Sequence, residues 1–109
     1  ATPNLYGQLI LAGKKKNAFV MLDTDGQALK EAVEYAPHAI KPNIHELSRL
    51  VEKDIEKESQ ILDACELLHE KGIKFVLVSR GKDGLILSTP DMKLKAVAPP
   101  VQVESTVGA

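Results

Sequence analysis

The segment FVLVSRGKDGLIL, residues 75–87, contains the clearest strand–turn–strand pattern in the chain. Its first part, Phe75–Val78, is apolar on both faces, which is typical of an interior strand of a parallel sheet. Gly81 and Gly84 then allow a tight turn, and the apolar residues 85–87 follow it directly. We therefore expect an interior strand at residues 75–78, joined by this turn to an antiparallel neighbour.

Helix and strand patterns alternate on the N-terminal side of this segment. Helix patterns occur at residues 3–15, 27–34, from 43 onward and around 61–68, and strand patterns at 18–22 and 38–41. In the first helix Leu5, Leu9 and Ala12 share one face, which is the pattern of an amphipathic helix. Another strand is expected at residues 92–97. The order predicts an α/β fold: a mainly parallel sheet flanked by helices, with an antiparallel edge.

Length and composition limit the class of protein. The 109 residues suffice for one small domain, and 44% hydrophobic with 27% charged residues is ordinary for a soluble globular protein. With 14 basic and 15 acidic side chains the net charge is −1, so nothing favours nucleic acid or an anionic membrane surface as a partner. The single cysteine, Cys65, cannot form an internal disulfide. We expect it in the core, and we expect a reducing, cytoplasmic compartment.

The ends of the sequence favour a partial chain. No apolar run approaches the roughly 20 residues that span a bilayer, and the start lacks the basic and apolar regions of a secretion signal. The first residue is Ala1 rather than methionine. We therefore expect part of a longer protein that has no membrane partner.

Polar residues follow three of the expected strands, at residues 23–26, 41–46 and 79–84. In open parallel sheets, ligands bind at the carboxyl ends of the strands. The first segment, Asp-Thr-Asp-Gly, could place a carboxylate beside a ligand. Aspartate and glycine at a strand end are nevertheless usual in a turn and a helix cap, and taken alone this segment favours that reading.

The second segment, KPNIHE at residues 41–46, has two compatible interpretations. Asn43 and Glu46, three residues apart, form the pattern of a capping box at a helix start. Alternatively, Lys41 offers a cation for phosphate, while the oxygens of Asn43 and Glu46 suit hydrated Mg²⁺ near a triphosphate. Spacing alone favours the cap. His45, like His38 and His69, is expected at the surface or partly packed, without a catalytic role.

The third segment, SRGKDG at residues 79–84, also has two interpretations. Asp83-Gly84 between apolar runs is a hairpin signal, so a plain connection is favoured. A hydroxyl at Ser79 and a glycine at 81 would also let backbone N–H groups approach a phosphate closely. The segment is not a Walker A motif, because the Gly-Lys-Ser/Thr ending is absent.

Taken in order, LDTDGQAL (22–29), KPNIHEL (41–47), VSRGKDGLIL (78–87) and ESTVGA (104–109) resemble consecutive landmarks of the phosphofructokinase B, ribokinase-like family of carbohydrate kinases. The resemblance runs along essentially the whole chain and implies that residues 1–109 are a partial ribokinase-like nucleotide-binding domain, truncated at both ends. The last motif resembles the start of the family's C-terminal signature, which continues into Gly-Asp. The chain stops at Ala109, so the catalytic aspartate is expected just beyond it, and no catalytic residue is expected within this chain.

The resemblance also implies which residues bind the cofactors ATP and Mg²⁺. Asn43 and Glu46 match the family's Asn-x-x-Glu motif and are the expected metal-associated residues. The expected nucleotide-binding residues are Lys41, Asn43, Ser79, Arg80, Gly81, Lys82, Asp83, Gly84, Gly108 and Ala109. Ser105 stands where ribokinase-like members that bind a monovalent cation have aspartate, so whether such a cation binds near Ser105 stays open.

The residues of these motifs are similar to those of the phosphofructokinase and tagatose-6-phosphate kinase branch of the family. The implied reaction is transfer of the γ-phosphoryl group of ATP to fructose 1-phosphate or fructose 6-phosphate by the longer protein, with ATP and a small phosphosugar as its partners. The alternatives are a tagatose-6-phosphate kinase, a non-catalytic nucleotide-binding module, or a structural fragment whose Asn43 and Glu46 only cap a helix. Whether the longer protein forms a homodimer stays open. The short chain alone is expected to be inactive.

Overall fold

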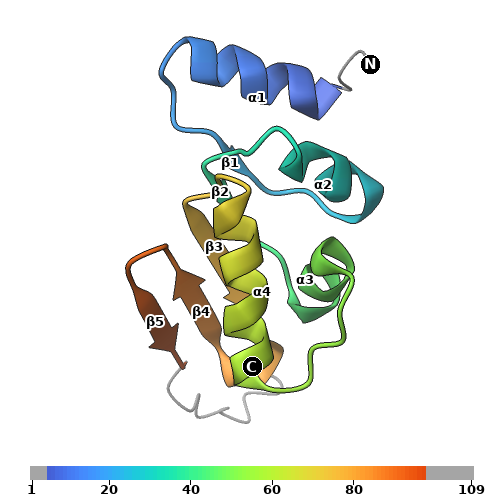
Figure 1. Cartoon of the computed structure of the whole chain (residues 1–109), viewed down its shortest axis with the longest axis vertical. Coiled ribbons are helices and arrows are strands. Elements are labelled where there is room, and N and C mark those ends of the chain that lie inside the picture. The colour runs from blue at the N-terminus through green and yellow to red at the C-terminus, as the bar shows by residue number, and fades with distance from the viewer. Residues whose placement is uncertain (1–4, 98–109) are drawn as a thin grey trace, which may run out of the picture.

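The computed structural model describes residues 5–97, which form a five-stranded sheet with four α-helices (Figure 1). The strands are β1 (Met21–Leu22), β2 (Ala39–Ile40), β3 (Phe75–Ser79), β4 (Leu85–Ser88) and β5 (Lys93–Ala96). They lie in the sheet in the order of the sequence. β1, β2 and β3 are parallel, whereas β3, β4 and β5 are antiparallel. The expected α/β class, with its antiparallel edge, is therefore confirmed.

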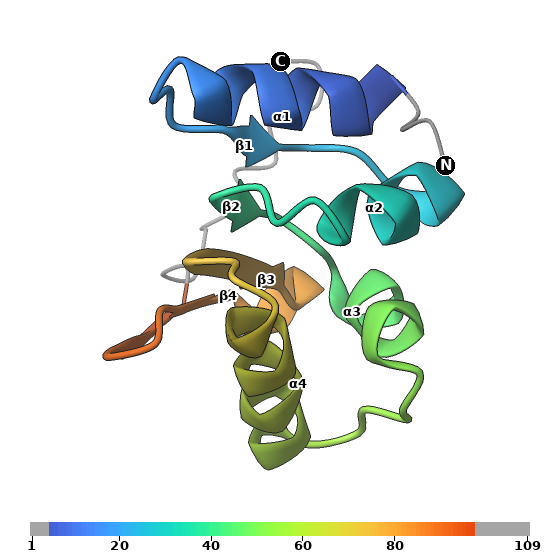
Figure 2. The ribbon, with the colours of Figure 1, turned by 45° about the horizontal axis from the view of Figure 1, so that its top comes forward.

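The helices are α1 (Leu5–Lys15), α2 (Gly26–Val33), α3 (Ile44–Val51) and α4 (Glu58–Glu70). α2, α3 and α4 lie on one side of the sheet, and α1 lies beside α2 at the β1 end (Figures 1 and 2). α2 connects β1 to β2, and α3 and α4 connect β2 to β3. Parallel strands require such crossovers, and their common hand places these helices on the same face. Within residues 5–97, no helix is both long and apolar enough to cross a membrane.

One face of the sheet, called here the covered face, packs against the helices. Leu22 pairs with Ile40, and Ile40 pairs with Val76, so the three side chains form one row across β1, β2 and β3. None of the three is more than 8% exposed. The helices contribute further apolar side chains to the same core: Ile10, Leu29, Ala32, Val33, Leu47, Ile61, Ala64, Cys65 and Leu68.

The opposite face, called here the open face, carries apolar side chains that no described helix covers. The members of the open face are Met21, Phe75, Leu77, Leu85, Leu87 and Leu94. Leu77, Leu87 and Leu94 stand side by side on three neighbouring strands. Met21 is 53% exposed and Leu94 is 51% exposed. The main hydrophobic cluster of residues 5–97 therefore lies on the covered side of the sheet, and Ala39 is the buried residue on the open side of β2.

The apolar face expected for the first helix is wrong. Leu5 and Leu9 are 65% and 56% exposed, whereas Ile10 is fully buried. The buried face of α1 also carries glycines: Gly7 is buried, and a Cβ added to Gly13 would lie 2.5 Å from Cγ2 of Val20. Because glycine lets a backbone approach its neighbour closely, the helix packs through this face rather than through its leucines.

The covered face contains one buried polar side chain among the described residues, Ser88. Nδ1 of His69 lies 2.7 Å from the carbonyl oxygen of Ile73, which can only accept, so Nδ1 donates. Nε2 of His69 then accepts from the hydroxyl of Ser88 at 2.8 Å. Burial raises the pKa of the neighbouring Cys65 thiol. As expected, Cys65 is a free cysteine in the core.

Candidate functional site

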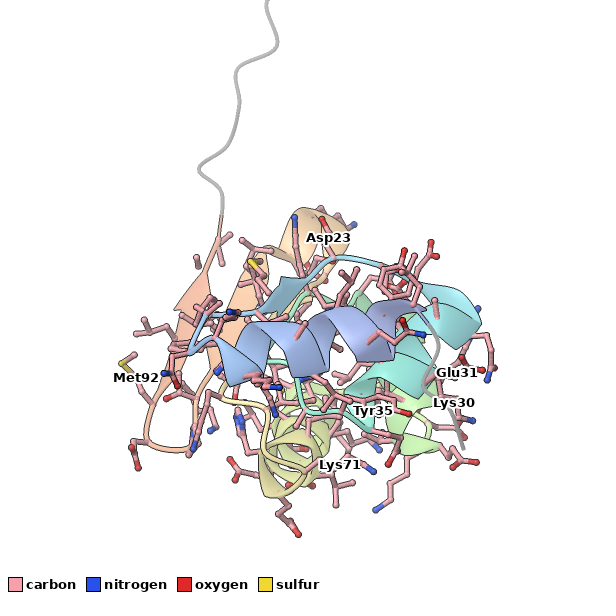
Figure 3. The ribbon with its side chains drawn as sticks, turned by 90° about the horizontal axis from the view of Figure 1, so that it is seen from above. Asp23, Lys30, Glu31, Tyr35, Lys71 and Met92 are labelled. Atoms are coloured by element: carbon pink, nitrogen blue, oxygen red, sulfur yellow. The ribbon has the colours of Figure 1, made fainter. Side chains whose placement is uncertain are left out.

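The carboxyl ends of β2 and β3 bring two of the three polar segments together. Asn43 and Ser79 form an isolated parallel bridge, and the backbone N–H of Ser79 donates to the carbonyl of Pro42 at 3.0 Å. Pro42 ends β2 as the sequence indicated, because it has no N–H to continue the ladder. The first segment follows β1 at the same edge of the parallel sheet, and Figure 3 shows Asp23 on the side of the molecule where the turn after β3 lies.

The capping box expected at Asn43 and Glu46 is present. The Asn43 side-chain oxygen accepts from the backbone N–H of Glu46 at 2.8 Å, and Oε1 of Glu46 accepts from the backbone N–H of Asn43 at 3.0 Å. This pair satisfies two N–H groups at the start of α3. Oε2 of Glu46 makes no hydrogen bond within residues 5–97, so the carboxylate keeps one oxygen for another partner.

The turn after β3 is longer than a two-residue hairpin at Asp83-Gly84, because residues 80–84 all lie between β3 and β4. It contains a short 3₁₀ helix, η1 (Gly81–Asp83), closed by a hydrogen bond from the backbone N–H of Arg80 to the carbonyl of Gly84 at 2.8 Å. Gly84 has φ of +90°, and a Cβ there would lie 2.0 Å from the carbonyl oxygen of Ala96. Gly84 is therefore required by the packing of β5 against the turn.

Gly81 differs from Gly84 in its surroundings. It has φ of +59°, and a Cβ built on it would meet no atom within 4 Å among the described residues. The space in front of its backbone is therefore open to another molecule. Of the two glycines, Gly81 alone has the close access that was expected of an anion-binding turn.

A cleft of about 390 Å³ lies between this turn, the start of α3 and the start of α4. The predicted residues that line it are Asn43, Ser79, Arg80, Gly81 and Asp83. The lining residues that were not predicted as site residues are Ile44, His45, Ile55, Glu56, Lys57, Glu58 and Ile61. Three members of the second group, Ile55, Glu56 and Lys57, were missed because residues 52–57 have the composition of a charged surface connection. The position of α4 in the fold places the end of this connection at the cleft.

Some predicted residues lie elsewhere. Lys41 and Lys82 are exposed and do not line the cleft. Glu46 lines a neighbouring hollow between α2 and α3 and reaches the cleft only through its hydrogen bonds with Asn43. Gly108 and Ala109 are outside the described residues.

The charges around the cleft are mixed. Arg80 and Lys57 are its cations, and Glu56, Glu58 and Asp83 are its carboxylates. Glu58 pairs with Lys95 of β5 at 3.2 Å. No group of three or more His, Cys, Asp or Glu side chains that could hold a metal ion occurs in the described part of the chain. A metal ion at this edge would therefore need oxygen ligands from water or from a bound phosphate as well.

Comparison with known proteins agrees with this outline. The pfkB family of carbohydrate kinases matches residues 2–109. The 1-phosphofructokinase of Bacillus subtilis is 35% identical over 104 residues, which are 95% of this chain and 34% of the relative. The ATP-dependent 6-phosphofructokinase isozyme 2 of Escherichia coli is 34% identical over 104 residues, covering 94% of this chain and 34% of the relative.

Solved structures show the same relationship. Phosphofructokinase-2 from Escherichia coli, in complex with fructose-6-phosphate, matches with a TM-score of 0.83 and 30% identity, over 94% of this chain and 34% of its own. Arabidopsis thaliana ribokinase, complexed with ribose and ATP, matches with a TM-score of 0.78 and 31% identity, over 95% of this chain and 35% of its own. The architecture is thus part of a ribokinase-like fold. The chain belongs to the pfkB family of carbohydrate kinases, and it spans about a third of the length of these relatives.

Proposed function

We propose that this chain is the nucleotide-binding portion of an ATP-dependent sugar-phosphate kinase. The observation that carries the proposal is the bridge between Asn43 and Ser79, which joins two family motifs at one edge of the sheet and beside one cleft. The phosphofructokinases among the relatives support a phosphosugar as the acceptor. Residues 1–109 then form part of a larger ribokinase-like domain.

The residues at the cleft suit a nucleotide with its metal ion. Ser79 and the open backbone at Gly81 face the cleft and can bind phosphate oxygens, while the Asn43 cap fixes the start of α3 beside them. Glu46 has one carboxylate oxygen outside the capping box, so it can orient water bound to Mg²⁺ without losing the cap. When bound, Mg²⁺ supplies positive charge that neutralises the phosphates. Gly108 and Ala109 begin the anion hole in this proposal, and the catalytic base follows them.

The acceptor is proposed to be fructose 1-phosphate or fructose 6-phosphate, with tagatose 6-phosphate as the third candidate. The test is ATP-dependent formation of the bisphosphate from each of the three by the longer protein that contains this chain. We expect turnover of one of them, and none by the 109-residue chain. Turnover by the short chain would refute the placement of the base outside it. A longer protein that binds ATP but phosphorylates none of the three would favour the non-catalytic module.

The role of Glu46 is tested separately from its capping role. Glu46→Gln keeps an oxygen that accepts from the backbone N–H of Asn43, and glutamine is common at this position of a capping box. We expect it to leave thermal stability nearly unchanged but to raise the Mg²⁺ concentration needed for half-maximal activity of the longer protein. Glu46→Ala should both lower thermal stability and raise the Mg²⁺ concentration needed for half-maximal activity. A stability loss with unchanged Mg²⁺ dependence in Glu46→Gln would support a purely structural cap.

A further inference from the structure

Arg80 is held at the cleft with its guanidinium incompletely partnered. The side chain is half-buried, and Nη2 donates to the carbonyl of Asp83 at 2.8 Å. Nε is buried and has no hydrogen-bond acceptor within the described residues. Buried donors are nearly always paired in folded proteins, because an unpaired one has lost its water without gaining a partner. In this position the Nε donor of Arg80 therefore makes no hydrogen bond within the described residues.

The charge of Arg80 also lacks a close counter-ion. None of the three ion pairs within residues 5–97 includes it. Of the carboxylates that line the cleft, that of Glu58 is already paired with Lys95 at 3.2 Å. The carboxylate oxygens of Glu56 and Asp83 make no ion pair with the Arg80 guanidinium within 4.0 Å. Arg80 is thus a half-buried cation, beside an open cleft, whose charge no described side chain neutralises directly.

The backbone next to Arg80 is accessible from the same cleft. Gly81 lines the cleft and has no atom within 4 Å of the place a Cβ would occupy. An anion that approaches this backbone comes beside the guanidinium, whose donors match the geometry of phosphate oxygens. To turn toward such an anion, Arg80 gives up one hydrogen bond, the one to Asp83.

The geometry points to Arg80 as a residue that binds a phosphate oxygen of the nucleotide in this cleft. This inference rests on the proposed function, since it names the group within the same site that recognises the polyphosphate. The competing interpretation is structural: Arg80 only holds the turn closed through Asp83. The two differ in ligand dependence, because a structural role affects all ligands equally, whereas a phosphate contact affects only ligands with phosphates.

The test compares ATP with adenosine, titrated calorimetrically into the longer protein that contains this chain. Arg80→Met keeps the length of the side chain and removes its charge. We expect this variant to raise the dissociation constant of ATP at least about tenfold, the usual order for a lost hydrogen bond to a charged group, and to leave that of adenosine unchanged. Arg80→Lys keeps the charge without the forked donors, and we expect a smaller loss.

Lys74→Met is the matched control, because Lys74 is an exposed cation at the amino end of β3, the end opposite Arg80. It removes the same charge and should leave ATP binding unchanged. Equal weakening of ATP and adenosine by Arg80→Met, or unchanged ATP binding, would overturn the inference while leaving the proposed function intact. Absence of ATP binding by the unaltered longer protein would overturn both this inference and the proposed function.

Discussion

The covered face and the open face of the sheet are built from neighbouring positions on the same strands, yet their environments are opposite. Ile40 on β2 is fully buried among helix side chains, whereas Leu94 on β5 is about half exposed. Both faces are apolar, so composition does not distinguish them. What distinguishes them is that α2, α3 and α4 all connect parallel strands and lie on one side. The stability of this chain should therefore depend on one face only.

The largest effect is expected from a matched pair of truncations. Ile40→Ala and Leu94→Ala each remove three carbons, the first from the covered face and the second from the open face. Ile40→Ala should lower the free energy of unfolding by about 2–5 kcal/mol, because it leaves a cavity. Leu94→Ala should change it by less than about 0.5 kcal/mol, as is usual at the surface. Urea denaturation of the 109-residue chain measures both, and equal losses would show that the open face is covered in solution.

A smaller loss is expected at the polar centre of the covered face. Ser88→Ala removes the hydroxyl that donates to Nε2 of His69 and leaves that nitrogen unpartnered. The expected loss is about 1–3 kcal/mol, which is the usual cost of an orphaned buried polar group. Ser59→Ala, at an exposed position of α4, is the control and should be nearly neutral. If both variants unfold at the same urea concentration, the His69–Ser88 hydrogen bond contributes nothing measurable.

A pH-dependent effect is expected at the rim of the covered face. Lys93 of β5 pairs with Glu66 of α4 at 2.8 Å and lowers the pKa of Glu66 below its ordinary value. Glu66 therefore holds its proton less tightly in the folded chain than in the unfolded one. The pair stabilises the fold above the unfolded-state pKa of glutamate, about 4.3, and this contribution is lost as the pH falls through the lower folded-state pKa.

Lys93→Met should remove this acid dependence. Thermal melting between about pH 6 and pH 2 should show a smaller decline for Lys93→Met than for the unaltered chain. Lys74→Met is again the control, because it removes one positive charge outside any described ion pair. The effect should be small, since both partners are partly solvated and salt screens such pairs. Identical acid profiles for all three chains would contradict it.

The smallest change in stability, but a visible change in association, is expected on the open face. Contiguous apolar side chains on an exposed face favour contact between molecules. We expect the 109-residue chain to self-associate as its concentration rises. Leu94→Gln should weaken this association in sedimentation experiments while leaving the melting temperature nearly unchanged. Unchanged association in this variant would show that other surfaces, such as the exposed leucines of α1, are responsible.

The parts of the fold that depend on short-range patterns could be predicted from the sequence. The apolar run at 75–78 and the glycines after it predict β3 and its turn, because both depend only on residues that are neighbours in the sequence. The buried face of α1 could not be predicted from periodicity, because its leucines and Ile10 lie on different faces of the helix. Both faces carry apolar residues at helical spacing. The close approach of Gly13 to Val20 decides between them, and that contact depends on the tertiary structure.

The candidate site shows the same limit. Asn43 and Ser79 were expected together because both follow parallel strands, and the bridge between them confirms that placement. No sequence pattern predicted Lys57 and Glu58 at the cleft. Their position depends on the path of the connection after α3, which sets where α4 begins in space. The incomplete pairing of Arg80 is likewise a matter of three-dimensional contacts, which spacing alone does not encode.

The strand order has a consequence for how the chain folds. Each strand pairs only with its neighbours in the sequence, so no strand must be inserted between two that are already paired. The β3–β4–β5 meander closes the shortest loops and should form early, since short loops lose less chain entropy on closure. β2 and β1 can then add in turn, β2 together with α3 and α4 and β1 together with α2. The two-residue strand β1, at the end of this series, should exchange its amide hydrogens fastest among the strands.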